Sequence, residues 1–261
     1  MTSGAGFPDL GLRVFSGLVM AAVGFGSVYL GGIVFLLVLV VCAGLMIWEL
    51  LRMVAPGDSQ LLIIALSVAA AATVLRAGFG GNALSFFILF LVPAVGFIFL
   101  HEKKLLFAGY SAAILLAVAS VYMFRASFGF SFTVWLILVV IAADVGGYFA
   151  GRRFGGPKIY PNLSPKKTWS GTIGGLVLAA IVGAFFGVGA GFVLLSVLTA
   201  AASQFGDVAE SAVKRRTGVK DSSNLIPGHG GLLDRFDGLI GAALFVLIYF
   251  MIFRLPEFGG V

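Results

Sequence analysis

Charged residues are scarce in this sequence, since Asp, Glu, Lys and Arg make up 11% of its 261 residues. A soluble domain has about 25% charged residues. Hydrophobic residues make up 60% of the chain, and the mean hydropathy is +1.11. This composition excludes a soluble globular enzyme and a disordered chain, because such proteins could not hide so much apolar surface. It predicts an all-α, polytopic integral membrane protein whose apolar helices are solvated by the lipid bilayer.

Cysteine and histidine are nearly absent. A single cysteine, Cys42, excludes a disulfide within the chain and a cysteine-based zinc site. Two histidines, His101 and His229, exclude a multi-histidine metal centre. The sequence also lacks a P-loop motif and a G-x-S-x-G motif, which argues against those nucleotide-binding and hydrolase folds.

Nine apolar segments are long enough, or nearly so, to cross a bilayer as helices. Fusing or dropping one short segment would give an eight-span alternative. The nine expected segments are 12–30, 33–51, 60–76, 84–100, 105–123, 132–150, 172–187, 191–210 and 238–253.

The distribution of lysine and arginine predicts the orientation of these segments. If the N-terminus is cytoplasmic, only Arg76, Arg125 and Arg254 among the 17 cations face the other side. The remaining fourteen would be cytoplasmic, which is a strong positive-inside bias. We therefore interpret the net charge of +6 as a consequence of topology and expect no nucleic-acid partner.

The charges divide the chain into two expected parts. Residues 1–140 form apolar helices that anchor the protein, face lipid and offer contacts for a homodimer. Residues 141–261 form the catalytic part, with cytoplasmic loops at 151–171 and 214–237. Sixteen of the 28 charged residues lie between Asp144 and Asp237.

The eighth segment extends into a charged stripe. On a helix, Asp207, Glu210, Ser211 and Lys214 share one face. Because charged groups are costly at bilayer depth, this stripe should face protein, water or a ligand. The alternative is an ordinary Glu210–Lys214 ion pair on a solvated helix end.

Three further features flank this stripe. A Gly- and Pro-rich loop follows it and could approach an anion, and Asp234 and Asp237 then open the last helix. If these two acids lie close to Asp207, the three carboxylates would form an oxygen-rich site suited to Mg²⁺ or Mn²⁺. Upstream, Asp144 lies within the sixth segment, and Lys166 and Lys167 lie where anionic headgroups would be. Simpler explanations exist for each feature. The helix dipole favours acids such as Asp234 and Asp237 at a helix start, and Asp144 could form a buried ion pair. The two lysines could be attracted to anionic lipid headgroups.

The C-terminal part resembles the phosphatidate cytidylyltransferase (CDP-diacylglycerol synthase) family. The similarity is firm over about 144–238. An acid is usual in that family where Ser170 stands, so no role is inferred for Ser170. The matching pattern is Ser211-Ala-Val-Lys214-Arg215-x4-Lys220-Asp221-x5-Pro227-x-His229-Gly230-Gly231-Leu-x-Asp234-Arg235-Phe-Asp237, preceded by Asp144-x3-Tyr148, Gly151-Arg152 and Ser164-Pro165-Lys166-Lys167-Thr168-Trp169-x-Gly171.

This resemblance implies Mg²⁺-dependent transfer of CMP from CTP to phosphatidate, releasing pyrophosphate. It also implies a bacterial inner membrane as the location, with the active site on the cytoplasmic face. Mn²⁺ is an alternative metal, and a monovalent cation could accompany it. We expect Asp207 and Asp234 to hold the metal, with Asp237 or Asp221 as a further ligand. His229 would donate to pyrophosphate or move a proton, or simply brace its loop. The expected substrate-binding residues are Asp144, Lys166, Lys167, Ser211, Lys214, Arg215, Lys220 and Arg235.

Three other functions are weighed against this one. The CDP-alcohol phosphotransferases use a D-x3-D spacing, whereas Asp234 and Asp237 are spaced D-x2-D. A CTP-dependent polyprenol kinase would release CDP in place of pyrophosphate. An ion-coupled transporter would use Asp144 and Asp207 as ion sites, but no internal repeat supports it.

Overall fold

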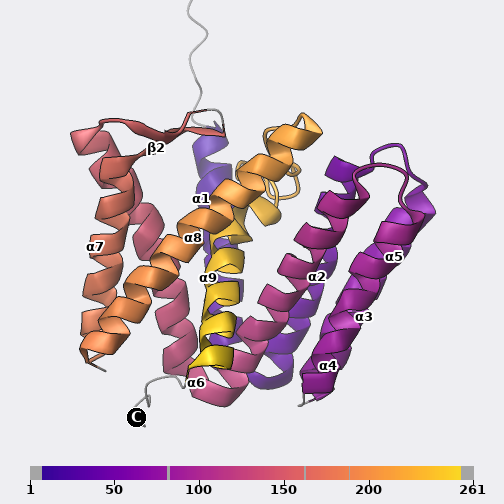
Figure 1. Cartoon of the computed structure of the whole chain (residues 1–261), viewed down its shortest axis with the longest axis horizontal. Coiled ribbons are helices and arrows are strands. Elements are labelled where there is room, and N and C mark those ends of the chain that lie inside the picture. The colour runs from indigo at the N-terminus through magenta and orange to yellow at the C-terminus, as the bar shows by residue number, and fades with distance from the viewer. Residues whose placement is uncertain (1–7, 81–82, 162, 188, 254–261) are drawn as a thin grey trace, which may run out of the picture.

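The fold is a bundle of long helices that lie side by side, as Figure 1 shows for the computed structural model of the chain. The structure describes residues 8–80, 83–161, 163–187 and 189–253. Its helices confirm the all-α expectation, with one short hairpin added. The helices are α1 (Pro8–Leu30), α2 (Gly32–Val54), α3 (Gln60–Gly80), α4 (Ala83–Phe87), η1 (Ile88–Phe90), α5 (Leu91–Phe99), α6 (Lys104–Phe154), α7 (Trp169–Phe185), α8 (Ala190–Thr217) and α9 (Leu233–Ile252).

Six helices of the described chain are long and apolar enough to cross a membrane, namely α1, α2, α3, α6, α8 and α9. Two shorter apolar stretches, Ser85–Phe99 and Trp169–Phe185, correspond to the expected fourth and seventh segments. The 51-residue α6 contains both the fifth and the sixth segments. These findings support a membrane protein, while the count of nine crossings stays a prediction.

A single residue divides α6 into two arms. Gly129 has φ 81° and ψ −169°, which is a non-helical conformation that favours glycine. In Figure 1 the α6 label lies at the lower end of the bundle, opposite the end that carries β2. The expected segments 105–123 and 132–150 leave a connector over 124–131, whereas in the structure both helical arms continue up to Gly129. The expected boundary between residues 140 and 141 therefore falls inside the second arm of α6.

The upper end of Figure 1 brings together the elements that carry most of the charges. The hairpin, the C-terminal end of α8 and the start of α1 lie there, and α9 ends at the lower end. Arg125 belongs to the other end, where its Nε donates a 2.8 Å hydrogen bond to the Val28 carbonyl near the end of α1. Arg254 lies outside the described residues. Which end is cytoplasmic stays a prediction.

The expected loop at 151–171 contains a small antiparallel hairpin, with β1 (Lys158–Tyr160) paired to β2 (Ser164–Thr168). Side chains alternate along a strand, so the two lysines of β2 point in different directions. Lys166 is exposed, whereas Lys167 is half-buried. Thr168 ends the strand and caps α7, because its Oγ1 accepts a 3.2 Å hydrogen bond from the Gly171 amide.

Glycines allow the helices that surround the hairpin to approach closely. A Cβ added to Gly146 of α6 would lie 2.7 Å from the Gly174 carbonyl oxygen of α7. A Cβ added to Gly183 of α7 would lie 3.1 Å from the Cα of Val193 in α8. Small residues permit this kind of helix contact in membranes. They hold α6, α7 and α8 together, which positions the charged residues described next.

Candidate active site

A cavity of about 540 Å³ lies between the second arm of α6, α7, β2 and α8. Its polar lining comes from three separate parts of the sequence, which the fold brings together. Four predicted site residues line it, and Tyr148 and Arg152 of α6 add an aromatic ring and a further cation. The four are Asp144, Lys166, Lys167 and Asp207.

Lys167 links the hairpin to α8 across this cavity. Its Nζ lies 2.6 Å from Oδ2 of Asp207 and donates a 3.2 Å hydrogen bond to the Gln204 carbonyl. Ser211 is 3.5 Å from the other oxygen of Asp207, one turn along α8. The Asp207 carboxylate is therefore fixed from β2 and from its own helix. This contact joins residues 40 positions apart, which no local pattern in the sequence reveals.

A second charged cluster, around Lys214, is more buried than the pair formed by Lys167 and Asp207. The Lys214 Nζ is 2.7 Å from Oε2 of Glu210 and 2.6 Å from Oδ1 of Asp234. The three side chains are 13%, 0% and 9% exposed, respectively. The predicted Glu210–Lys214 pair exists, but the solvated helix end offered as its explanation is wrong, because Glu210 is completely buried. Oε1 of Glu210 has no hydrogen-bond partner within the described residues.

Asp234 ties the ends of the loop between α8 and α9. Its Oδ2 accepts hydrogen bonds from the Ser222 amide at 3.0 Å, the Ser222 hydroxyl at 3.0 Å and the Gly231 amide at 2.8 Å. Its Oδ1 faces Lys214. Gly218, with φ 78°, ends α8 in the left-handed conformation and directs the chain into this loop. Asp234 is thus a well-partnered carboxylate that organises the loop.

Asp237 connects the two clusters electrostatically. It is half-buried one turn after Asp234, and its charge interacts with those of Asp207, Asp144 and Glu210. No group of three or more His, Cys, Asp or Glu side chains in the described chain is arranged to hold a metal by itself. Mg²⁺ usually binds through one or two carboxylates together with water and phosphate oxygens. Asp144 and Asp207 line the cavity, and Asp237 interacts electrostatically with both, so this set of carboxylates fits that requirement.

The remaining predicted residues lie on the exposed side of the loop. Arg235 donates from Nε and Nη2 to the His229 carbonyl at 3.0 and 2.6 Å. Arg215 reaches the Val219 carbonyl at 3.4 Å, and Lys220 and Asp221 are exposed. The structure does not bring Asp221 into hydrogen-bond contact with the other acids of the described chain.

His229 is braced by the first helix. Its Nδ1 is 2.9 Å from the Ser16 Oγ of α1, and the same hydroxyl donates to the Pro227 carbonyl at 3.0 Å. A hydroxyl has one proton to donate, so with that proton on Pro227 the histidine carries its own proton on Nδ1. In that arrangement Nε2 of neutral His229 is left as an acceptor. These contacts support the loop-bracing alternative, and the proton-transfer role stays a hypothesis.

Two residues of the N-terminal half belong to the site and were missed from the sequence. Glu49 of α2 is completely buried and accepts hydrogen bonds from the start of α9. The Tyr110 hydroxyl of α6 is buried among the acid charges, without a hydrogen-bond partner in the described chain. The only signal in the sequence was a lone acid or tyrosine within an apolar segment. An acid within a membrane-spanning segment is by default a candidate functional residue, and this rule would have identified Glu49.

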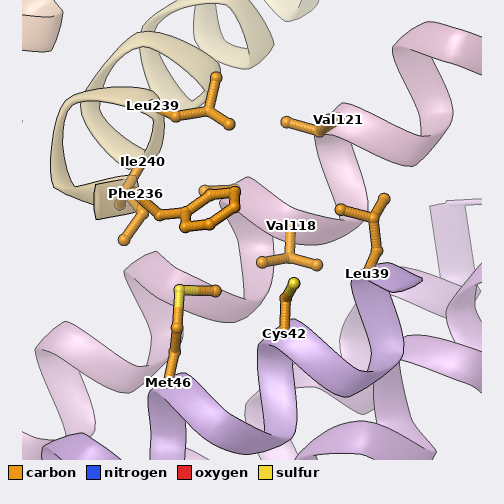
Figure 2. Close-up of a pocket in the computed structure, with 9 residues that line it drawn as sticks. Leu39, Cys42, Met46, Val118, Val121, Phe236, Leu239 and Ile240 are labelled. Carbon is orange, nitrogen blue, oxygen red and sulfur yellow. The ribbon is translucent and has the colours of Figure 1, made fainter. Parts of the chain in front are cut away.

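Apolar contacts seat α9 against the same two helices. Figure 2 shows Phe236, Leu239 and Ile240 of α9 facing side chains of α2 and α6 around a cavity of about 20 Å³. The cavity lining is apolar, which keeps so small a space dry. Phe236 follows Asp234 by two residues, so this packing fixes the first turn of α9 from the side opposite the loop.

Comparison with known proteins identifies the family. The family model described as "Cytidylyltransferase family" matches residues 11–253. The phosphatidate cytidylyltransferase of Brucella suis biovar 1 (strain 1330) is 45% identical over 161 residues, which cover 59% of this chain and 57% of that protein. The enzyme of the same name from Haemophilus influenzae is 46% identical over 136 residues, covering 48% and 47%. That from Helicobacter pylori (strain J99) is 41% identical over 159 residues, covering 58% of each. The matched regions thus span about half the length of these curated relatives, and the chain belongs to the cytidylyltransferase family.

Proposed function

We propose that this protein is a phosphatidate cytidylyltransferase, which converts CTP and phosphatidate into CDP-diacylglycerol and pyrophosphate. The observation that carries the proposal is the cavity at the charged end of an apolar helical bundle, where lysines and arginine face carboxylates. Both substrates are polyanions, and one of them is a lipid. The names of the relatives support the same reaction.

The reaction is an in-line displacement at phosphorus. An oxygen of the phosphatidate phosphate forms a bond to the α-phosphorus of CTP, while the bond from that phosphorus to pyrophosphate breaks. A phosphate monoester is already nucleophilic, so the site needs no serine or cysteine nucleophile. Catalysis then depends on alignment and charge neutralisation. Lys166 and Arg152, which are exposed at the cavity, hold the lipid phosphate, and Lys167 meets CTP when it releases Asp207.

Asp207 and Asp237 are the residues we propose to hold Mg²⁺, with Asp144 beside them. Bound there, Mg²⁺ would neutralise phosphate charge and orient the triphosphate. Asp207 has one cationic partner, and Asp237 already interacts with Asp207. Asp234 was expected as the second ligand, but it would have to exchange Lys214 and three loop hydrogen bonds for the metal.

A magnesium titration of three variants tests this assignment. Asp207→Asn and Asp237→Asn should raise the Mg²⁺ concentration for half-maximal rate at least tenfold, because each removes a ligand charge. Asp234→Asn should lower the maximal rate with a smaller change in Mg²⁺ dependence. The matched control is Glu102→Gln, which changes an exposed acid far along the chain. Normal turnover of the first two variants at limiting Mg²⁺ would refute the assignment.

The function itself is tested with the purified protein, CTP, phosphatidate and Mg²⁺, measuring pyrophosphate and the lipid product together. Equal amounts of pyrophosphate and CDP-diacylglycerol are expected. Release of CDP with a phosphorylated lipid alcohol would instead indicate a kinase. Ion flux into liposomes without CTP would indicate a transporter.

The finer placement of the protein is part of the same proposal. The N-terminus and the active site would face the cytoplasm of a bacterial inner membrane, with nine crossings. Cysteine labelling at position 220, on the exposed loop, from each side of sealed vesicles distinguishes the two orientations. A homodimer is also proposed: a Cβ added to Gly191 would meet no atom of another described element within 4 Å, which leaves room there for a second copy. Light scattering in detergent measures that assembly.

A further inference from the structure

Glu49 is an acid in the N-terminal half of the chain, buried near the end of α2. Among the described residues, no cation forms an ion pair with its carboxylate, whose contacts are hydroxyl and amide groups. A buried carboxylate without a cation is costly unless several donors surround it. All of its hydrogen-bond donors come from residues 222–233, more than 170 positions further along the chain.

Both carboxylate oxygens of Glu49 accept hydrogen bonds. Oε1 accepts from the Leu232 amide at 2.9 Å and from the Ser223 hydroxyl at 2.5 Å. Oε2 accepts from the Leu233 amide at 2.7 Å and lies 3.4 Å from the Ser222 hydroxyl. The two amides belong to the start of α9, where a helix has no internal partners for its first N–H groups. Glu49 therefore caps α9 from another helix, and its negative charge suits the helix dipole.

The same loop holds Asp234 on its other side. The Ser222 hydroxyl lies between the two acids, 3.0 Å from Asp234 and 3.4 Å from Glu49. A Cβ added to Gly231 would lie 2.7 Å from Oε1 of Glu49, while the Gly231 amide donates to Asp234. The loop is thus held between two carboxylates that contact the same residue, Ser222. Because Lys214 pairs with Asp234, the position of that lysine depends on the same contacts.

We propose that Glu49 is a positioning residue of the active site: from α2 it fixes the start of α9 and holds the Asp234 carboxylate against Lys214. The N-terminal half is then part of the catalytic apparatus as well as an anchor. Figure 2 shows the apolar continuation of this contact, where Met46, one turn before Glu49, faces Phe236 and Ile240. The catalytic consequence rests on the proposed cytidylyltransferase activity, but the structural consequence does not.

The test uses Glu49→Gln in the full-length protein. Glutamine has the same shape, but in either orientation its NH₂ group faces a backbone N–H, because both oxygens of Glu49 accept from amides. We expect hydrogen exchange in peptides covering 231–236 to accelerate about 10- to 100-fold, as expected for losing a charge-assisted hydrogen bond. The rest of α9 should exchange as before. We expect kcat to fall at least tenfold, with KM for phosphatidate changed less than twofold, because the proposed lipid-phosphate residues lie on β2 and α6.

Two further variants keep the test decisive if Glu49→Gln is poorly folded. Glu49→Asp retains the charge and should recover part of the exchange protection and of kcat. Ser223→Ala removes one donor and should shift both measurements in the same direction by a smaller factor. Glu102→Gln, an exposed acid of the same half, should change neither.

The outcomes separate this inference from the proposed function. Faster exchange in Glu49→Gln, together with a wild-type protein that makes no CDP-diacylglycerol, would uphold the structural contact and refute the activity. Wild-type exchange at 231–236 in Glu49→Gln would overturn the inference, whatever the kinetics. So would faster exchange with an unchanged kcat in an active protein.

Discussion

Replacing Lys214 with methionine removes the positive charge that lies between the carboxylates of Glu210 and Asp234. Methionine approximates the length of the lysine stem, so the packing of α8 changes little. Glu210 then loses the one cation that pairs with it in the described chain, while its side chain remains completely buried. We expect both a stability defect and a loss of activity.

The magnitude follows from burial. Removing one partner of a buried ion pair costs about 3–5 kcal/mol, because the remaining charge has neither water nor a partner. For a domain of 150–250 residues, 1 kcal/mol corresponds to roughly 2–4 °C in melting temperature. Lys214→Met should therefore lower the melting temperature by roughly 6–20 °C. Arg216→Met, which removes an exposed cation from the same turn of α8, should lower it by less than about 2 °C.

The assay is thermal unfolding in detergent, followed for the single variants and for Lys214→Met combined with Glu210→Gln. The double variant should regain at least half of the lost stability, because the buried charge is gone, yet its CMP transfer should stay at least tenfold below wild type. This would separate the structural need for Lys214 from its proposed contact with phosphate. A Lys214→Met protein that melts within about 2 °C of wild type would refute the reasoning.

Two further predictions concern packing and the loop. Gly146→Ala should destabilise the protein by about 1–3 kcal/mol, because its Cβ would lie 2.7 Å from the Gly174 carbonyl oxygen. Gly109→Ala, where nothing lies within 4 Å, should not destabilise it, and thermal unfolding compares the two. Ser16→Ala removes the partner of His229 Nδ1, so the ¹⁵N chemical shifts of the ring should show a changed tautomer balance. An unchanged spectrum would show that Ser16 does not select the tautomer.

Local rules were sufficient for much of the candidate active site. Helical periodicity placed Asp207 and Lys214 on one face of α8, and the contacts of Ser211 and Glu210 confirm it. Glycine and proline predicted the loop after α8, and Asp234 does lie in the first turn of the next helix. These predictions succeed because spacing of three or four residues decides which side chains are neighbours on a helix.

Other features could not be read from the sequence because they depend on contacts between distant segments. The pairing of Lys167 with Asp207 requires β2 to lie over α8, and the strand itself was expected to be a loop. The link from Glu49 to Leu233 joins the second helix to the last. No local spacing encodes such pairs.

The sequence by itself determined that this is an all-α protein suited to a membrane, with its charges concentrated in the C-terminal half, because apolar content and charge pattern decide where a chain is soluble. Its motifs also indicated the cytidylyltransferase family. Only the tertiary structure decided which acids form ion pairs and hydrogen bonds with other residues. It joins Asp234 to Lys214 and the loop, places Asp144 and Asp207 in the cavity lining with Asp237 in electrostatic contact with both, and brings Glu49 to the start of α9. The physical reason is that a charge in an apolar bundle is stable only where other elements supply its hydrogen bonds, and the packing of the helices determines which elements do so.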